Sequence, residues 1–342
     1  MRPLVHPALA RVWRDSTTVQ IGLDPARAVV LAGLGPTEVA VLRSMDGVHD
    51  IAALRAAAER VGGSAAAADR LVEILDGAGV LIDGDRVRRG DSGDALAPDR
   101  ASRGLLGAAE GSEEAGRPEE PHDPLATRRQ AHVEVRGAGR IGATIARLLS
   151  AAGIGQVSVE DFGRTTAHDV MPGGLSPDDA GLPRGLAVSA TLPDGPDRPD
   201  RGPDLVVLAP TASLARDDAA ALLRLGIPHL AASVIETTGV VGPLVLPGAS
   251  SCLRCHDMHR TDRDPAWPRI IAQTDGRLTG VAACDVTLAA LVAALAAQQV
   301  LAHLDGFVPA TVDGTVETSL PFGMPRRRSW QPHPACGCTW AA

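Results

Sequence analysis

The sequence predicts an α/β protein in which a small α+β, winged-helix-like module precedes a Rossmann-like domain with a structural zinc site. Three features support this: β-prone and helical segments alternate from residue 131 onward, a glycine-rich turn follows the first of those strands, and the cysteines form two close pairs. A chain of 342 residues is long enough for two domains. We expect the module to span 1–89, a flexible linker 90–130 and the second domain 131–342.

The first 89 residues have the pattern of a hairpin followed by three helices. Two β-prone runs within residues 17–33 flank an Asp-Pro dipeptide, which predicts a turn between them. An apolar run at 80–82 precedes an Asp-Gly-Asp sequence and predicts a second, smaller hairpin, or wing. Between the hairpins, apolar residues recur at helical spacing in three segments, 36–45, 50–61 and 64–77.

Composition argues against nucleic acids and membranes as partners. The formal net charge is −8, and residues 1–89 hold eleven Arg against eleven Asp and Glu, so the basic footprint of a nucleic-acid-binding or membrane-binding protein is missing. We find no apolar run of membrane-spanning length and no apolar signal core, and we expect a cytoplasmic protein. Residues 90–128 are rich in Gly, Ala, Ser, Glu and Pro, which predicts the flexible linker. The chain contains no Lys and no Asn.

The second domain has the pattern of a parallel sheet covered by helices. A strand at 132–136 is followed by a helix that ends near residue 152 and a strand at 156–159. A further strand, helix and strand follow at 204–209, 213–225 and 229–231. This alternation is typical of parallel strands joined by crossover helices.

The glycine-rich turn predicts a nucleotide site. Gly137 permits a tight turn, Gly139 lets a phosphate approach the backbone, and Gly142 lets the helix pack against the strand. The N-terminus of that helix offers unpaired N–H groups to an anion. Asp161 follows Gly142 at about the 20-residue spacing of an acid that holds ribose hydroxyls.

The five cysteines favour a metal site in a reducing compartment over a disulfide framework. Four thiolates suit tetrahedral Zn²⁺, although four free thiols are the alternative. The fifth, Cys284, is expected to be a small buried hydrophobe, with a helix-activated thiol as the other interpretation. His256 and His333 flank the pairs as substitute ligands. The expected ligands are Cys252, Cys255, Cys336 and Cys338.

From about His132 to Cys338 the chain resembles the ThiF/MoeB-type activating enzymes, relatives of the ubiquitin-activating enzymes. The resemblance rests on the glycine loop, the segment 152–161, Gly226–His229, the cysteine pairs and the Ala-rich segment 286–304. It implies a domain that binds ATP and adenylates the C-terminal carboxylate of a small protein or peptide.

Three departures from the family pattern argue against adenylation. The segment after Asp161 contains neither the Asn nor the Lys of the family, and Arg164 is the residue there that could contact a phosphate. Thr211 or a neighbour stands where the family has an Asp for Mg²⁺. Because phosphoryl-type chemistry depends on cations that hold the ATP, we expect ATP binding to be doubtful. The reactive cysteine of the family lies where this chain has residues 278–280, so Cys284 does not match it.

The N-terminal module resembles the PqqD-like domains that bind leader peptides of ribosomally made, modified peptides. Followed by a ThiF-like domain, it resembles the ThiF-like partner proteins of azoline-forming cyclodehydratases. This implies a precursor (leader) peptide and a YcaO-type enzyme as partners, and it leaves a homodimer open. A leader could add a strand to an uncovered hairpin edge. The expected peptide contacts are Val19, Ile21, Val29, Leu71 and Leu75.

The sequence therefore supports two alternative functions. The first is a non-adenylating partner protein that binds a precursor peptide and presents it to a modifying enzyme; the second is a divergent ATP-dependent adenylyltransferase. The missing Lys, Asn and Asp favour the first, and the glycine loop with Asp161 keeps the second open. The basic run Arg326–Arg328 is expected to be a solvated turn, with a contact to an acidic partner as the alternative.

Overall fold

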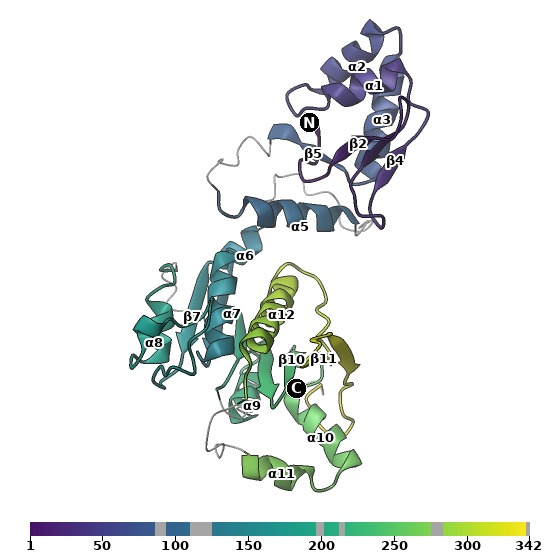
Figure 1. The fold of residues 1–342 in the computed structure, drawn as a ribbon. Coiled ribbons are helices and arrows are strands. Elements are labelled where there is room, and N and C mark those ends of the chain that lie inside the picture. Colours follow the sequence, from purple (N-terminus) through teal and green to yellow (C-terminus); the bar gives the residue numbers. More distant parts are fainter. Residues whose placement is uncertain (86–93, 110–124, 196–201, 212–215, 275–282, 340–342) are drawn as a thin grey trace. The chain divides into compact units, whose positions relative to one another are not determined.

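A computed structural model of the chain describes residues 1–85, 94–109, 125–195, 202–211, 216–274 and 283–339. The chain divides into two compact units, Met1–Pro124 and Leu125–Ala342 (Figure 1). Each unit has a hydrophobic core of its own.

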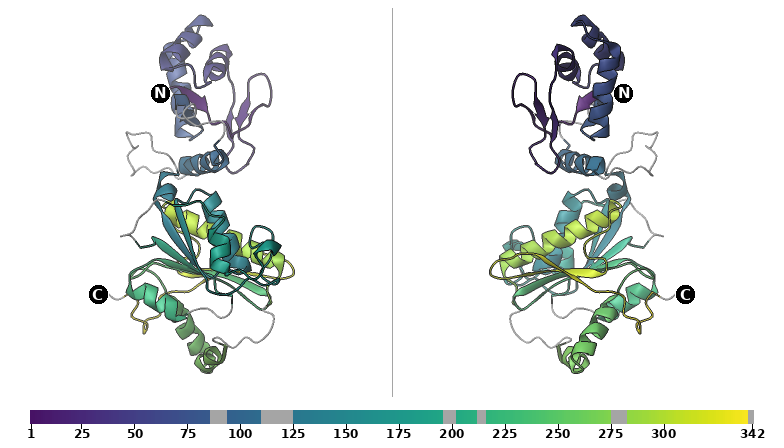
Figure 2. Two further views of the ribbon diagram at one scale, coloured as in Figure 1. Left: turned by 90° about the vertical axis from the view of Figure 1, so that its left-hand side faces the viewer. Right: turned by 90° about the vertical axis from the view of Figure 1, so that its right-hand side faces the viewer.

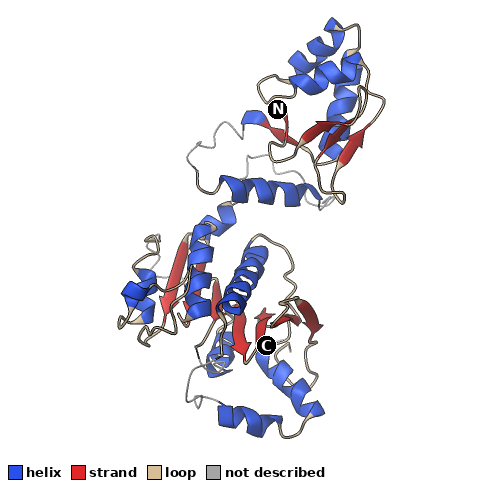
Figure 3. Cartoon of the chain, viewed as in Figure 1, coloured by secondary structure: helices blue, strands red, loops and turns tan. Residues whose placement is uncertain are grey.

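The first unit contains a three-stranded antiparallel sheet, a two-stranded sheet and helices (Figure 3). The three-stranded sheet has the order β2-β3-β4, and β1 pairs with β5. The elements are β1 (Pro3–Val5), β2 (Arg11–Trp13), β3 (Val19–Ile21), β4 (Val29–Leu31), α1 (Pro36–Ser44), α2 (Ile51–Arg60), α3 (Ala65–Gly77), β5 (Leu81–Asp83) and α5 (Ala97–Ala109).

The three predicted helices are confirmed as α1, α2 and α3. Polar side chains fix where two of them begin: Asp50 accepts a hydrogen bond from the Ala53 N–H, and Ser64 accepts one from the Ala67 N–H. The apolar faces of the helices then pack against the sheet. Their buried side chains include Val41, Leu42, Leu54, Leu71 and Leu75.

The predicted hairpin is confirmed as β3 and β4, but β2 pairs with the other side of β3. This makes β3 a central strand, so the expectation of an open edge beside it is wrong. Val19 and Ile21 are fully buried, and so are Leu71 and Leu75 on α3. These four residues form the core and cannot line a peptide groove; Val29, on the edge strand β4, remains half-buried.

Leu81–Asp83 pairs with β1, and the residues that would form the return strand of the predicted second hairpin, 86–93, lie outside the described part of the chain. The expectation of a flexible linker needs correction. Residues 97–109 of the expected linker form the helix α5, as the Ala and Leu content of this stretch allows. Residues 110–124, the rest of that stretch before the second unit, lie outside the described part of the chain.

A seven-stranded sheet forms the centre of the second unit, in the order β12-β11-β10-β9-β8-β6-β7. The pairs among β6, β7, β8 and β9 are parallel, as predicted. From β9 to β12 the pairs are antiparallel, a half of the sheet that was not predicted. The elements are α6 (Ala126–Gln130), β6 (His132–Arg136), α7 (Arg140–Ala151), β7 (Gln156–Glu160), α8 (Arg184–Ser189), β8 (Leu205–Leu208), α9 (Arg216–Arg224), β9 (His229–Ile235), β10 (Thr238–Val245), α10 (Leu253–Arg263), α11 (Trp267–Thr274), α12 (Val286–Leu304), β11 (Gly314–Ser319) and β12 (Arg326–Ser329).

Helices cover both faces of the sheet (Figure 2). Alternate residues of β8 show the two layers: Leu205 and Val207 belong to the core that contains α7 and α12, whereas Val206 and Leu208 pack with α9. All four side chains are buried, as is usual for a parallel strand covered on both sides.

Helix α12 corresponds to the Ala-rich segment 286–304. It is the one helix of the described residues that is long and apolar enough to cross a membrane, with a mean hydropathy of 1.6. Its residues Leu288, Val292 and Val300 are buried in the core against the sheet and α7. At its C-terminal end Asp305 forms a buried ion pair with Arg128 of α6, which ties the start of the second unit to this helix.

Candidate functional site

The glycine loop has the predicted position at the C-terminal edge of the parallel strands. It joins β6 directly to α7, and Gly137 has a φ of +97°, which favours glycine. A Cβ on Gly137 would lie 2.2 Å from the Ala209 carbonyl oxygen, and one on Gly142 would lie 1.8 Å from the Gly137 carbonyl oxygen. These two glycines are therefore required by the backbone packing of the loop itself.

The remaining glycine of the loop, Gly139, faces a side chain. A Cβ on Gly139 would lie 2.4 Å from Cγ2 of Thr211, the residue at the expected position of a Mg²⁺ carboxylate. Thr211 thus approaches the loop where a phosphate was expected. Its hydroxyl lies 3.5 Å from the Arg184 guanidinium, and it supplies no negative charge for a metal ion.

Asp161 lies at the end of β7 with its carboxylate fully occupied by protein donors. Oδ2 accepts hydrogen bonds from the Ala138 N–H at 2.7 Å and from Arg184 Nε at 3.0 Å. Oδ1 accepts from the Gly163 N–H at 2.7 Å and from Arg184 Nη2 at 3.1 Å. A carboxylate has about four acceptor positions. A ribose diol could therefore bind Asp161 only by displacing one of these donors.

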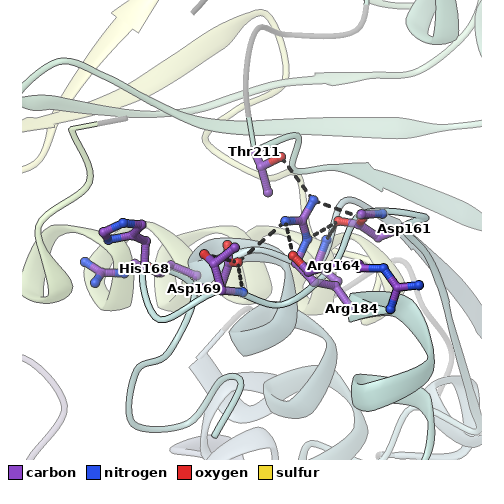
Figure 4. A network of polar contacts seen from close by, with 10 residues as sticks. Asp161, Arg164, His168, Asp169, Arg184 and Thr211 are labelled. Carbon is purple, nitrogen blue, oxygen red and sulfur yellow. Dashed lines mark hydrogen bonds and ion pairs between the residues drawn. The ribbon is translucent and has the colours of Figure 1, made fainter. Parts of the chain in front are cut away.

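Arg184 is the central cation of this site (Figure 4). Its guanidinium pairs with Asp161 and lies 3.5 Å from Asp169, which also accepts hydrogen bonds from Thr166. Burial acts to lower the pKa of Arg184, but the hydrogen bond and charge of Asp161 outweigh it, so the pKa is raised. The side chain is 14% exposed, which places a permanent positive charge inside the expected nucleotide pocket.

The expectation that Arg164 supplies the phosphate-binding cation is not supported by its position. Arg164 is exposed, and its guanidinium donates to the Gly181 carbonyl oxygen at 2.7 Å. Arg184 was missed because its partner Asp161 lies 23 residues away. One signal was available: a basic residue in the first turn of a helix opposes the helix dipole and so calls for a nearby carboxylate.

The pocket that remains beside the loop has a volume of about 270 Å³, slightly below the roughly 300–1,000 Å³ of ordinary ligand pockets. Phe162, at its edge, is 88% exposed. Of the acidic residues that line it, Glu160 lies 3.4 Å from Arg136 and Asp161 is fully occupied. The pocket is lined by Arg136, Gly137, Glu160, Asp161, Phe162, Arg184, Leu208, Pro210, Thr211 and Asp218.

The four paired cysteines come together as predicted, from the start of α10 and the C-terminal tail. Their sulfurs lie within 4.8 Å of one another. Cys252 Sγ is 3.8 Å from Cys255 Sγ and 3.6 Å from Cys336 Sγ, and Cys255 Sγ is 3.3 Å from Cys338 Sγ. Four sulfurs at 2.3 Å from a tetrahedral zinc ion would be about 3.8 Å apart. The cluster could therefore hold a zinc ion with little movement.

The ionisation of these thiols is mutually dependent. A hydrogen bond from Cys252 lowers the pKa of Cys255 to about 4, whereas burial raises the pKa of Cys338 to about 12. The hydrogen bond to Cys255 and burial likewise raise the pKa of Cys252. A divalent metal ion would supply the positive charge that lets all four sulfurs ionise together.

The two histidines proposed as substitute ligands have other contacts. The His256 ring stacks on Trp330 with centroids 4.8 Å apart, and His333 Nε2 lies 2.9 Å from an Asp262 carboxylate oxygen. His333 and Asp262 also lie close to His259. The Ala335 N–H donates to His333 Nδ1, which leaves the proton on Nε2 and opposes metal binding there.

Cys284 precedes α12 and is half-buried, as expected for a small hydrophobe. Burial raises the pKa of its thiol, which opposes the alternative of an activated nucleophile. Its backbone carbonyl accepts a hydrogen bond from Arg140 at 2.6 Å, linking the start of α7 to the start of α12.

No protein-family model matches the chain, and no curated protein sequence matches it. Solved structures do match it along nearly its whole length. Escherichia coli MccB with AMPCPP and MccA has a TM-score of 0.74 and 14% identity, covering 99% of both chains. MccB with ATP has a TM-score of 0.70 and 15% identity, again over 99% of both. PaaA has a TM-score of 0.65 and 18% identity over 94% of this chain and 98% of its own.

MccB and PaaA are enzymes of the ThiF/MoeB family, which is related to the ubiquitin-activating enzymes. TM-scores of 0.65–0.74 establish a common architecture, and identities of 14–18% leave the chemistry to be argued from the residues themselves. The chain therefore has the mixed α/β fold of the ThiF/MoeB enzymes, with a cysteine cluster that could hold zinc.

Proposed function

We propose that this chain is a ThiF-like, non-adenylating partner protein that binds a precursor peptide and presents it to a separate modifying enzyme of the YcaO type. The observation that carries the proposal is the saturated carboxylate of Asp161. Arg184 and two backbone N–H groups occupy its acceptor positions, so the ribose site is filled from within the chain.

The surroundings of Asp161 support the same conclusion. Adenylation needs cations that neutralise the phosphates of ATP, with a carboxylate to hold Mg²⁺. Thr211 stands near the expected carboxylate position, and Asp169 lies 3.5 Å from Arg184. The two arginines that line the pocket, Arg136 and Arg184, are already paired with Glu134 and Asp161.

Peptide binding is supported by the structural neighbours and by an available strand edge. MccB has been crystallised with MccA, and this chain covers 99% of that structure. In the first unit, the Gly22 N–H donates to the Ala10 carbonyl and the Arg14 N–H donates to the Thr18 carbonyl. Because hydrogen-bonded positions alternate in an antiparallel pair, the N–H and C=O of Gln20 on β3 point toward β2. The N–H and C=O of Val30, which pairs with Gln20 on β4, therefore point away from β3.

A peptide would thus add as a strand beside β4, using the N–H and C=O of Val30, and not beside β3. Val30 is 44% exposed, and Ile74 on α3 is 55% exposed. These residues replace the buried Val19, Ile21, Leu71 and Leu75 as candidate peptide contacts. Main-chain hydrogen bonds would supply affinity, and alternate side chains would supply specificity.

Peptide binding by the full-length chain tests this part of the proposal. The probe is the labelled leader of a precursor peptide encoded near this chain, measured by fluorescence anisotropy. Val30→Pro removes one outward-facing N–H and should weaken binding at least tenfold. Val30→Ala keeps that N–H and should bind within about threefold of the parent chain. Equal affinity of the parent and Val30→Pro, with both folded by circular dichroism, would reject the β4 edge.

An adenylyltransferase is the second candidate, because the glycine loop and the acid after β7 are both present and MccB has been crystallised with ATP. The two functions differ in one measurable step. A non-adenylating partner exchanges no pyrophosphate with ATP whatever peptide is supplied, whereas an adenylyltransferase does.

A further inference from the structure

The basic run Arg326–Arg328 is an edge strand, which corrects the expectation of a solvated turn. It lies in β12, at the end of the strand order, and pairs with β11. The Trp330 N–H donates to the Asp313 carbonyl oxygen at 2.8 Å, just beyond this ladder. In an antiparallel pair the hydrogen-bonded positions alternate. Arg326 and Arg328 therefore turn their main chains toward β11, whereas Arg327 and Ser329 turn theirs outward.

The outward-facing groups of β12 have no partner strand among the described residues. The sheet order ends at this strand, and no backbone hydrogen bond within the described part of the chain reaches the N–H of Arg327 or Ser329. Arg326, Arg327 and Ser329 are also exposed. The strand therefore offers a short row of donors and acceptors to another extended segment.

Arginine side chains gather on one face beside this edge. Trp330 is 3% exposed, and three guanidinium carbons lie over its ring: Arg260 at 5.3 Å, Arg328 at 5.6 Å and Arg263 at 5.7 Å. These distances are within the range of cation–π contacts. Because side chains alternate along a strand, Arg326 lies on the same face as Arg328. We call this set, Arg260, Arg263, Arg326 and Arg328, the basic face.

The basic face has fewer carboxylates than guanidinium groups. Glu317 lies 3.4 Å from Arg328. Asp257 is held by Arg216 at 2.8 Å and by the Trp267 indole N–H at 3.0 Å. Burial lowers the pKa of Arg260 even though both carboxylates are near it. In a chain of net charge −8, such a local excess of positive charge selects an anionic partner.

We infer that β12 and the basic face bind an extended acidic segment of a second polypeptide as an added strand. The segment would form main-chain hydrogen bonds with Arg327 and Ser329, and its acidic side chains, two residues apart, would reach Arg326 and Arg328. A nucleic acid fits less well, since the indole of Trp330 is buried and offers no stacking surface to a base. The site is in the second unit and goes beyond the binding of a leader beside β4.

Two synthetic peptides test this site on the full-length chain. One alternates Glu with Val or Thr over eight residues, and the other has Gln in place of each Glu. By fluorescence anisotropy the acidic peptide should bind at least tenfold more tightly than the Gln peptide, and high salt should weaken it. Arg326→Glu should reduce its affinity at least tenfold. Arg43→Glu, a change of the same charge at an exposed position on α1, should leave it unchanged.

A matched pair at Ser329 separates strand addition from simple charge attraction. Ser329→Pro removes an outward-facing N–H and should weaken the acidic peptide at least tenfold, whereas Ser329→Ala keeps the N–H and should bind as the parent does. Three results would overturn the inference. The first is equal binding of the acidic and Gln peptides. The second is equal affinity of folded Ser329→Pro and Ser329→Ala. The third is competition by single-stranded DNA of equal charge at the same concentration, which would indicate a general polyanion site.

Discussion

The Arg184 guanidinium forms a bidentate contact with the Asp161 carboxylate, with Nε 3.0 Å from Oδ2 and Nη2 3.1 Å from Oδ1. The two side chains are 14% and 7% exposed, so this pair is largely removed from water. Such two-bond contacts are among the stronger interactions between charged groups. In this chain the contact lies where the resemblance to adenylating enzymes places a ribose.

Removing one partner should show how much this contact contributes to the stability of the folded chain. Arg184→Ala leaves Asp161 largely buried with only its two backbone donors, and we expect a loss of about 3 kcal/mol in the free energy of unfolding. Arg184→Lys keeps the positive charge but cannot form the bidentate contact, so the free energy of unfolding should fall by less than in Arg184→Ala. Urea unfolding monitored by circular dichroism measures both. A stability equal to that of the parent chain in Arg184→Ala would show that the pair is not structural.

Pyrophosphate exchange tests the proposed lack of adenylation. We expect no exchange above background with ATP and Mg²⁺, with or without a precursor peptide, because Asp161 is saturated and Thr211 lies near the expected metal position. Clear exchange that disappears in Asp161→Ala would establish the adenylyltransferase instead. ATP binding without exchange agrees with either function, so the exchange itself is the measurement that decides.

The cysteine cluster predicts one zinc ion per chain in protein purified without chelator. Cys252→Ser should release the ion and lower the free energy of unfolding by several kcal/mol, since a structural metal stabilises the folded state directly. Elemental analysis and thermal unfolding measure the two effects. Cys284→Ser is the matched control, because Cys284 lies outside the cluster and should leave zinc content unchanged. Metal-free protein of unchanged stability would contradict the prediction.

Acid should weaken the second unit partly through His229. This side chain is 1% exposed, and burial lowers its pKa. The unfolded chain therefore takes up a proton near the ordinary pKa of about 6.5, before the folded chain does. Stability from this group is present above that pH and falls below it, by up to about 1.4 kcal/mol per pH unit. Thermal unfolding between pH 7.5 and 5.5 should show a smaller drop in His229→Gln than in the parent.

The sequence was sufficient to predict helix starts and tight turns, because these depend on interactions between residues close together in the chain. The helical segments predicted to begin at residues 50 and 64 do begin there, capped by Asp50 and Ser64, and the glycines marked the turn from β6 to α7. The cysteine pairs were found by spacing, although only the fold brings them within reach of one another.

The errors have a common physical cause, which is pairing between distant segments. β2 is three exposed residues long and has no periodic pattern, yet its pairing with β3 decides which strand edge is free. Arg184 and Asp161 meet only when α8 folds against the end of β7. The antiparallel strands after β9 were missed for the same reason, and with them the exposed edge at Arg326–Ser329.

The cysteine cluster has a topological consequence. Cys255 and Cys336 come from either side of a segment that contains α12, β11 and β12. While a metal ion is bound, this segment is a closed ring whose two ends stay together until the ion is released. Opening of the core helix α12 would then require the tail to open with it. Amide hydrogens of α12 and of β11 should therefore exchange together, and a chelator should speed both by the same factor.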